Sequence, residues 1–244
     1  MIIYKGPSMV DGQPIVIIAT GIKRPSKNRK TGTMVQVWIF ADNGMTPMNS
    51  SKFGADVSVC GSCAKRALIR KMAKLQNIAV EPECYVDLSK APMKIMESYL
   101  AGAYPDISGN YAAIAAYFAR RIVRGGAYGD PMAGPAKLWR AVYRFSAGRT
   151  AYSHMWKDYR TRGFAAFGMA SVDSPEEREQ AHALGWRTFR VKKASDPVLP
   201  GELVCPASKE AGEKITCKVC QFCNGWSPLG RTNRATRDVV INSH

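Results

Sequence analysis

Residues 165–192, AAFGMASVDSPEEREQAHALGWRTFRVK, contain the pattern that decides the fold class. The stretch begins and ends with apolar runs that predict strands. Between these runs, 174–185 predicts a helix, in which Ser174 suits the N-cap, Pro175 the first turn, and Glu177 completes a capping box. A strand, a helix and a second strand in succession favour parallel pairing through a right-handed crossover.

The same alternation continues along the rest of the chain. Strands are expected at 15–20, 35–40, 56–60, 83–88, 150–156, 165–173, 187–192 and 202–206, and a strand followed by a turn at 122–131. Helices are expected at 64–75, 92–102, 111–121, 135–145 and 174–185. Irregular structure is expected at 1–14, at 23–32 and after 206.

These repeated units predict an α/β protein whose parallel strands form either a barrel or a doubly wound sheet. We expect residues 1–206 to form the α/β domain, with N-terminal strands included. Residues 207–244 are expected to form a cysteine-rich segment followed by a basic tail.

The composition limits the class of protein. With 46% hydrophobic and 22% charged residues, the 244-residue chain has an ordinary globular composition. It contains no apolar run long enough to span a membrane, and residues 1–12 do not resemble a secretory signal, so a cytoplasmic protein is expected. The net charge of +16 favours nucleic acid or a nucleotide as a partner, because phosphates attract an excess of Lys and Arg.

Four of the seven cysteines lie in VCPASKEAGEKITCKVCQFCNG, residues 204–225. In a reducing compartment such clustering indicates metal ligation more than disulfides. Three cysteines at x2 spacing with a remote Cys-Pro resemble ferredoxin ligands in a different order, and four thiolates also suit tetrahedral zinc. An iron–sulfur cluster and zinc therefore both remain open for a closed site on Cys205, Cys217, Cys220 and Cys223.

The other three cysteines are Cys60, Cys63 and Cys84, with the spacing C-x2-C-x20-C. One interpretation is a zinc site completed by His154, and a second is a set of buried reduced thiols. A third is a [4Fe-4S] cluster with three protein ligands, which leaves one iron open to a substrate or cofactor.

Several polar residues follow predicted strands, where chemistry collects in parallel α/β folds. Asp130, His154 and Asp173 are the candidate catalytic residues, and Ser171 is a candidate cofactor contact. His154 also suits a core position, and Asp after Gly is common in turns.

Segments that include VCGSC, RGGAYGDP, TAYSHMW and CKVCQFC resemble uncharacterised phage-encoded, cysteine-rich proteins related to the radical-S-adenosylmethionine-like barrel family. The resemblance spans roughly residues 20–225. It implies a partial (β/α) barrel, cluster ligation by the three-cysteine set, and S-adenosylmethionine as a possible cofactor. It also implies that Gly125, Gly126 and Asp130 line the cofactor or substrate pocket. The C-x3-C-x2-C spacing of the radical enzymes is absent here.

A basic turn at 23–32, KRPSKNRKTG, separates two predicted strands and is well placed for phosphate contact. Its basic residues are Lys23, Arg24, Lys27, Arg29 and Lys30.

The leading hypothesis is an iron–sulfur enzyme of the radical-S-adenosylmethionine-like type that acts on a nucleotide or nucleic acid, in host cytoplasm if phage-encoded. The alternative is a non-enzymatic nucleic-acid-binding protein with structural zinc.

Overall fold

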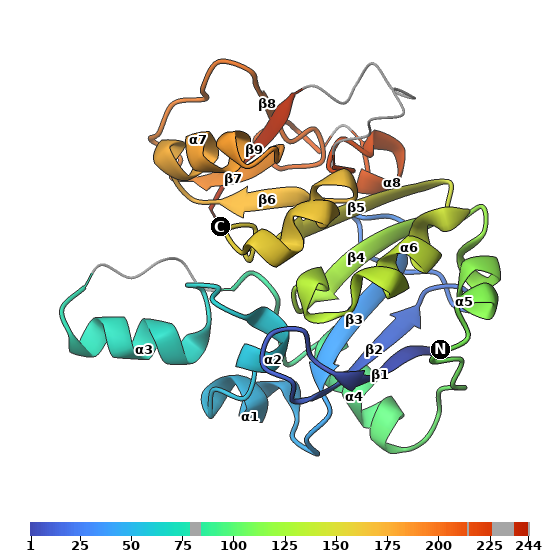
Figure 1. The fold of residues 1–244 in the computed structure, drawn as a ribbon. Coiled ribbons are helices and arrows are strands. Elements are labelled where there is room, and N and C mark those ends of the chain that lie inside the picture. The colour runs from blue at the N-terminus through green and yellow to red at the C-terminus, as the bar shows by residue number, and fades with distance from the viewer. Residues whose placement is uncertain (79–83, 214, 226–236, 244) are drawn as a thin grey trace.

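The computed structural model describes residues 1–78, 84–213, 215–225 and 237–243, and it confirms an α/β architecture (Figure 1). Its strands form one nine-stranded sheet in the order β1-β2-β3-β4-β5-β6-β7-β9-β8. The strands are β1 Ile2–Pro7, β2 Pro14–Thr20, β3 Val35–Ala41, β4 Ile122–Tyr128, β5 Gly148–Ser153, β6 Met169–Val172, β7 Thr188–Lys192, β8 Glu202–Val204 and β9 Asp238–Asn242.

Most of the sheet is parallel. The β1–β2 and β2–β3 pairs are antiparallel, and every other neighbouring pair from β3 to β8 is parallel. Among the described residues β1 and β8 remain edge strands that do not pair with each other. The structure therefore confirms a mostly parallel α/β sheet, whereas closure into a barrel is not confirmed.

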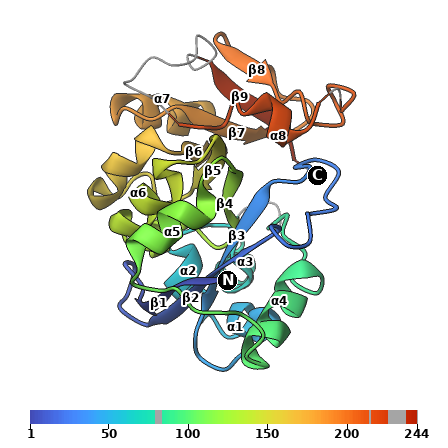
Figure 2. The same cartoon turned by 90° about the vertical axis from the view of Figure 1, so that its right-hand side faces the viewer.

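Helices lie on both sides of this sheet. Figure 2 shows α5, α6 and α7 on one side and α4 on the other. The helices are α1 Pro47–Lys52, α2 Val57–Cys60, α3 Ala67–Leu75, α4 Ala91–Leu100, α5 Tyr111–Phe118, α6 Ala136–Arg144, α7 Pro175–Ala183 and α8 Cys217–Cys220, with short 3₁₀ turns at Pro131–Ala133 and Tyr159–Ala166. No helix in the described part of the chain is long and apolar enough to cross a membrane.

The core is densest at β2 and β3. All seven residues of β3 are buried, because the strand has neighbours in the sheet and covered faces on both sides. On the α6 side, the rings of Trp139 and Tyr143 stack with centroids 5.7 Å apart. A Cβ added to Gly125 would lie only 2.3 Å from the Tyr143 hydroxyl oxygen, so glycine lets this helix approach β4 closely.

The strand–helix–strand unit quoted from the sequence is present. The Ser174 hydroxyl caps α7 by accepting from the Glu177 backbone N–H at 3.1 Å. The Glu177 carboxylate accepts from the Asp173 N–H at 3.0 Å, which is one residue earlier than a capping box requires. The first strand is shorter than predicted, because part of 165–173 continues a 3₁₀ turn and only Met169–Val172 pairs.

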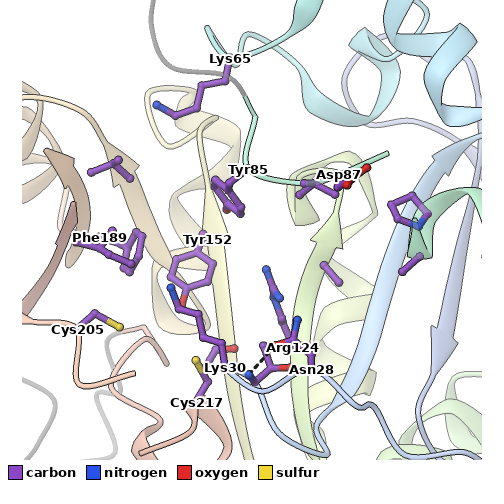
Figure 3. Close-up of a pocket in the computed structure, with 18 of the residues that line it drawn as sticks. Asn28, Lys30, Lys65, Tyr85, Asp87, Arg124, Tyr152, Phe189, Cys205 and Cys217 are labelled. Atoms are coloured by element: carbon purple, nitrogen blue, oxygen red, sulfur yellow. Dashed lines mark hydrogen bonds between the residues drawn. The ribbon is translucent and has the colours of Figure 1, made fainter. Parts of the chain in front are cut away.

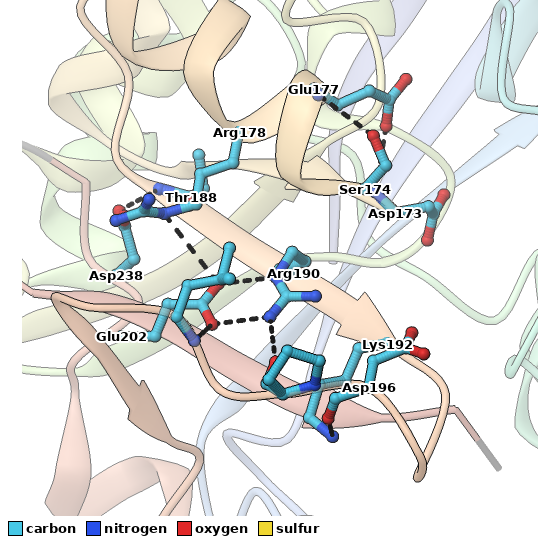
Figure 4. Close-up of polar contacts among 12 residues, drawn as sticks. Asp173, Ser174, Glu177, Arg178, Thr188, Arg190, Lys192, Asp196, Glu202 and Asp238 are labelled. Carbon is cyan, nitrogen blue, oxygen red and sulfur yellow. Dashed lines mark hydrogen bonds and ion pairs between the residues drawn. The ribbon is translucent and has the colours of Figure 1, made fainter.

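Buried ion pairs fix β9 between its neighbours (Figure 4). The Asp238 carboxylate accepts from the Arg178 side chain at 2.9 Å and from the Thr188 N–H at 2.8 Å, and it contacts His182 Nε2 at 2.8 Å. Nearby, Arg190 pairs with the fully buried Glu202 at 2.7 Å. These contacts join α7, β7, β8 and β9, so residues 207–244 contribute a strand to the same sheet as the rest of the chain.

Two strand predictions are wrong. Residues 56–60 form the one-turn helix α2, closed by a bond from the Cys60 N–H to the Asp56 carbonyl at 2.8 Å. Short apolar segments suit either a strand or a buried helix, so their pattern alone does not distinguish between the two. The predicted strand at 83–88 is absent over its described residues, 84–88, and Glu83 lies outside them. There Asp87 accepts from the Ser89 N–H at 3.0 Å in a local turn.

Two segments that were expected to be irregular contain strands. Residues 1–14 include β1, which pairs with β2, and the chain beyond 206 includes β9. It also includes the short helix α8. The helix α1 was not predicted either; its N-cap Thr46 accepts from the Asn49 N–H at 3.2 Å.

Candidate metal centres and ligand pocket

A buried ion pair shapes the loop that carries Cys60 and Cys63. The Arg66 guanidinium donates to Asp56 Oδ1 at 2.7 and 3.0 Å, and the two side chains are 8% and 4% exposed. The same guanidinium donates to the carbonyl oxygens of Gly54 and Gly61, at 2.9 and 3.1 Å. One side chain therefore links Asp56 to the backbone at Gly54 and Gly61, on both sides of α2.

This loop lies against the carboxyl end of β4. The Asp130 N–H donates to the Val59 carbonyl at 2.6 Å, next to Cys60. Burial raises the pKa of the Cys60 thiol well above its usual value, and Asp56, Cys63 and Cys84 raise it further. The fold thus brings the three predicted ligands of the first set into one neighbourhood, with Cys84 as the exposed member.

The four remaining cysteines also gather. Cys205 follows β8, Cys217 and Cys220 are the two ends of α8, and Cys223 follows that helix. Backbone bonds attach the set to the sheet: the Cys205 N–H donates to Val240 at 2.8 Å, and the Ala151 N–H donates to Cys223 at 3.1 Å.

Cys223 is one of the buried thiols of this set. Burial raises its pKa, the Tyr152 hydroxyl opposes that shift by hydrogen bonding to the sulfur, and the other three thiols of the set raise the pKa further. The four sulfurs are therefore neighbours, as the sequence spacing suggests.

Proximity is not the same as a formed coordination sphere. Within the described residues, no three His, Cys, Asp or Glu side chains are arranged so that they would hold a metal ion. Burial also raises the pKa of Cys63 to about 12, and a thiol must lose its proton to bind a metal. The thiol chemistry of both sets fits iron–sulfur or zinc ligation, and metal binding at either set stays a prediction.

A pocket of about 450 Å³ lies on the face of the sheet opposite α6 (Figure 3). Its walls come from β3, β4, β5, β7 and β9, from the start of α4 and from the segment after Cys84. Tyr85 and Lys65 lie toward one end, and Cys205, Cys217 and Lys30 lie toward the other. One pocket therefore reaches the neighbourhood of both cysteine sets.

The pocket contains four cationic side chains and one acidic side chain. Lys65 is 3% exposed and pairs with Asp173 at 2.6 Å, and Lys90 pairs with Asp87 at 2.8 Å. Arg124, which is half-buried in the middle of β4, has no hydrogen bond or ion pair with another described residue. The pocket is therefore positively charged with an unused guanidinium inside it.

The predicted catalytic residues lie at the carboxyl end of the strands. Asp130 accepts from the Met132 and His154 N–H groups at 2.9 and 2.8 Å and from the Ser153 hydroxyl at 3.1 Å. Burial raises the pKa of this carboxyl to about 6. Asp173 pairs with Lys65 at the rim of the pocket.

His154 lies beside the same group of residues. Burial lowers its pKa to about 4, although the nearby Asp173 opposes this shift, and its Nε2 is buried without a hydrogen-bond partner among the described residues. The ring is neutral at pH 7 and completes no metal site with the described cysteines.

Gly125 and Gly126 were expected to line a cofactor or substrate pocket. Gly125 faces α6, as described above, and Gly126 has a φ of 70° at the bend into the turn that ends at Pro131. Neither glycine lines the pocket, and neither does Asp130 or the buried Ser171. The neighbours Arg124 and Ala127 line it, and their inward direction depends on the register of β4, which the sequence does not reveal.

The basic turn is solvent-exposed along its charged residues Lys23, Arg24, Lys27, Arg29 and Lys30. Its Asn28 and Lys30 reach the rim of the pocket. Tyr152 lines the pocket, whereas Trp156 and Trp186 are buried in the core.

Comparison of the chain with protein-family models, with curated proteins and with solved structures gives no match.

Proposed function

We propose that the chain is a cysteine-ligated metalloenzyme that carries an open [4Fe-4S] cluster on Cys60, Cys63 and Cys84 and acts on a nucleotide or nucleic acid. The observation that carries this proposal is the ligand-sized pocket of about 450 Å³ beside the three-cysteine loop. Tyr85, the residue after Cys84, contributes to its wall. The resemblance to radical-S-adenosylmethionine-like proteins agrees with it.

The three thiols would hold the cluster, and a bound cluster would supply one-electron chemistry at its open iron. The chain's own residues have separate tasks. Arg66 orients the ligand loop through Asp56 and the Gly61 carbonyl. Asp130, whose pKa of about 6 is close to neutral, would hold or release a proton at the carboxyl end of β4.

The four-cysteine set has a different proposed role. Its members tie residues 205–223 to β5 and β9 through backbone bonds. We infer a closed structural centre of iron–sulfur or zinc at Cys205, Cys217, Cys220 and Cys223, because four thiolates satisfy either without a further ligand.

Anaerobic purification with iron, sulfide and zinc analysis tests the proposal. We expect a brown protein that contains both iron and sulfide, and we expect Cys60→Ser to lose the iron of the open cluster. Ser62→Ala is the matched control, because it alters the same loop at an exposed position without removing a thiol. A colourless protein with stoichiometric zinc and no sulfide would overturn the iron–sulfur part.

The basic turn favours the alternative of a non-enzymatic nucleic-acid-binding protein. All five of its cationic side chains are exposed, and none forms an ion pair with another residue that the structure describes. Replacing Lys23, Lys27 and Lys30 by Gln should weaken DNA or RNA binding and lower its salt dependence by about three released counterions at most. Unchanged binding and an unchanged salt slope would exclude this turn as the contact.

A further inference from the structure

The unpartnered guanidinium of Arg124 points to the ligand class of the pocket. Arg124 lines the pocket from the middle of β4, with Tyr85 toward one end of the pocket and Cys217 toward the other (Figure 3).

The charges around it leave a place for an anion. Lys65 and Lys90 are neutralised by Asp173 and Asp87, at 2.6 and 2.8 Å. Arg124 and Lys30 have no such partner among the described residues. A half-buried guanidinium without a counterion is costly, and a bound phosphate or carboxylate would supply two parallel hydrogen bonds to its fork.

The pocket walls are aromatic as well as basic. Tyr152 and Phe189 pack with ring centroids 4.6 Å apart and a tilt of 57°. Trp38 is also in the wall, and its indole N–H is already used by the Thr20 hydroxyl at 2.9 Å, so the ring offers mainly its apolar surface. Tyr85 lines the same pocket. Flat apolar surfaces of this kind bind nucleobases by stacking.

We propose that this pocket binds a mononucleotide, with its phosphate on Arg124 and Lys30 and its base against the aromatic wall. The volume of about 450 Å³ is that of a small-molecule site, whereas a nucleic-acid strand needs a groove that continues across the surface. This inference names the substrate class of the proposed function and rests on it only for the chemistry that follows binding.

Titration of the full-length protein as purified, with its metal content measured, tests binding separately from the identity of the metal. The probes are the four ribonucleoside 5′-monophosphates, their nucleosides, inorganic phosphate and a short single-stranded oligonucleotide. Their binding is measured by calorimetry and by tryptophan fluorescence. At least one monophosphate should bind at least tenfold more tightly than its nucleoside and than phosphate alone. Arg124→Gln should lower that affinity by about tenfold to hundredfold, as expected for hydrogen bonds to a charged group.

Arg162→Gln is the control, because Arg162 is exposed and outside the pocket lining. Arg124→Lys keeps the charge but loses the two-pronged donor, so it should bind with intermediate affinity and also serve if the Gln variant folds poorly. Equal binding of nucleoside and nucleotide, or equal affinity of the Gln variant and the control, would overturn the proposal. Tighter, Arg124-dependent binding of the oligonucleotide would overturn it in favour of a strand ligand.

The two proposals fail in different ways. A zinc protein without sulfide that still binds a monophosphate through Arg124 would refute the iron–sulfur enzyme and support the ligand assignment. An iron–sulfur protein that binds no monophosphate would support the iron–sulfur proposal and refute the ligand assignment.

Discussion

Removing Arg66 should destabilise the protein far more than removing an arginine from an equally well-formed surface pair. Arg66→Met deletes both hydrogen bonds to Asp56 and leaves that carboxylate 4% exposed without a counterion. Loss of one partner of a buried ion pair costs about 3–5 kcal/mol, because the remaining charge is neither hydrated nor neutralised. The carbonyl oxygens of Gly54 and Gly61 lose a donor as well, so the upper part of that range is expected.

The protein contains its own control for this change. Arg160 also makes a two-pronged contact with a carboxylate, Asp158, but their side chains are 56% and 27% exposed. Arg160→Met should change the free energy of unfolding by less than about 1 kcal/mol, since water replaces the lost bonds. Urea unfolding of the metal-free variants measures both values without a contribution from bound metal.

A double-variant cycle separates charge from packing. Arg66→Met combined with Asp56→Leu removes both charges, so the pair should lose less stability than the sum of the two single changes, by about 0.5–3 kcal/mol. The reasoning fails if Arg66→Met costs no more than Arg160→Met, or if the two single losses simply add. Iron uptake of the Arg66 variant should fall in parallel, because the same side chain holds the Gly61 carbonyl between the first two ligands.

Three further changes test other parts of the molecule. The His154 pKa of about 4 is below its unfolded value of 6.5, so lowering the pH from 6.5 to 4 should reduce the free energy of unfolding of the wild type by up to about 3 kcal/mol. His154→Leu should remove that loss, which urea titrations at a series of pH values measure. Gly125→Ala places a methyl group 2.3 Å from the Tyr143 hydroxyl and should lower the free energy of unfolding by about 1–3 kcal/mol. Gly163 has open space around it, so Gly163→Ala should lower it by less than about 0.5 kcal/mol. Equal melting temperatures of the two variants would contradict this reasoning. Cys223→Ser should lower the affinity of the four-cysteine set for its metal by at least about tenfold, which chelator competition measures, and an unchanged affinity would exclude this thiol as a ligand.

The sequence predicts several elements of the sheet and its crossovers well, because local signals and tertiary structure agree there. The helix α7 has a polar cap at Ser174, an acidic first turn and a glycine after its end, and it lies between two apolar strands. The strands β2 and β3, which pair antiparallel, are mostly apolar runs of the length that a doubly covered sheet requires, with Gln36 as the polar exception in β3. Each of these signals lies within a few residues of the element that it predicts.

The missed elements depend on contacts far away in the chain. The strand β9 has only five residues, and it is a strand because β7 and β8 pair with it on both sides. Its position between them is fixed by Asp238, which contacts Arg178 and Thr188 at a separation of 50 residues or more. Conversely, 56–60 has strand-like composition but folds as α2, because Gly61 reverses the backbone there with a φ of 56°. Composition over five residues contains neither kind of information.

The candidate site also has parts that local sequence predicts and parts that depend on distant contacts. Cysteine spacing predicts both thiol sets, because ligands of one set lie close together in sequence. The pocket between them is not visible in the sequence, since its wall takes single residues from β3, β4, β5, β7 and β9. Arg124 is one cation among 35 in composition, and only the register of β4 shows that it faces the pocket while Gly125 faces α6.

The pocket also changes how the two cysteine sets relate to each other. From spacing alone, the complete four-cysteine set is structural and the incomplete three-cysteine set is the chemical one. Yet Cys205 and Cys217 line the pocket directly, whereas the first set reaches it through Tyr85, the neighbour of Cys84. A metal on the four-cysteine set would therefore form part of the floor of the pocket, next to the proposed anion site at Arg124 and Lys30. Its structural role would then be to hold that floor in place.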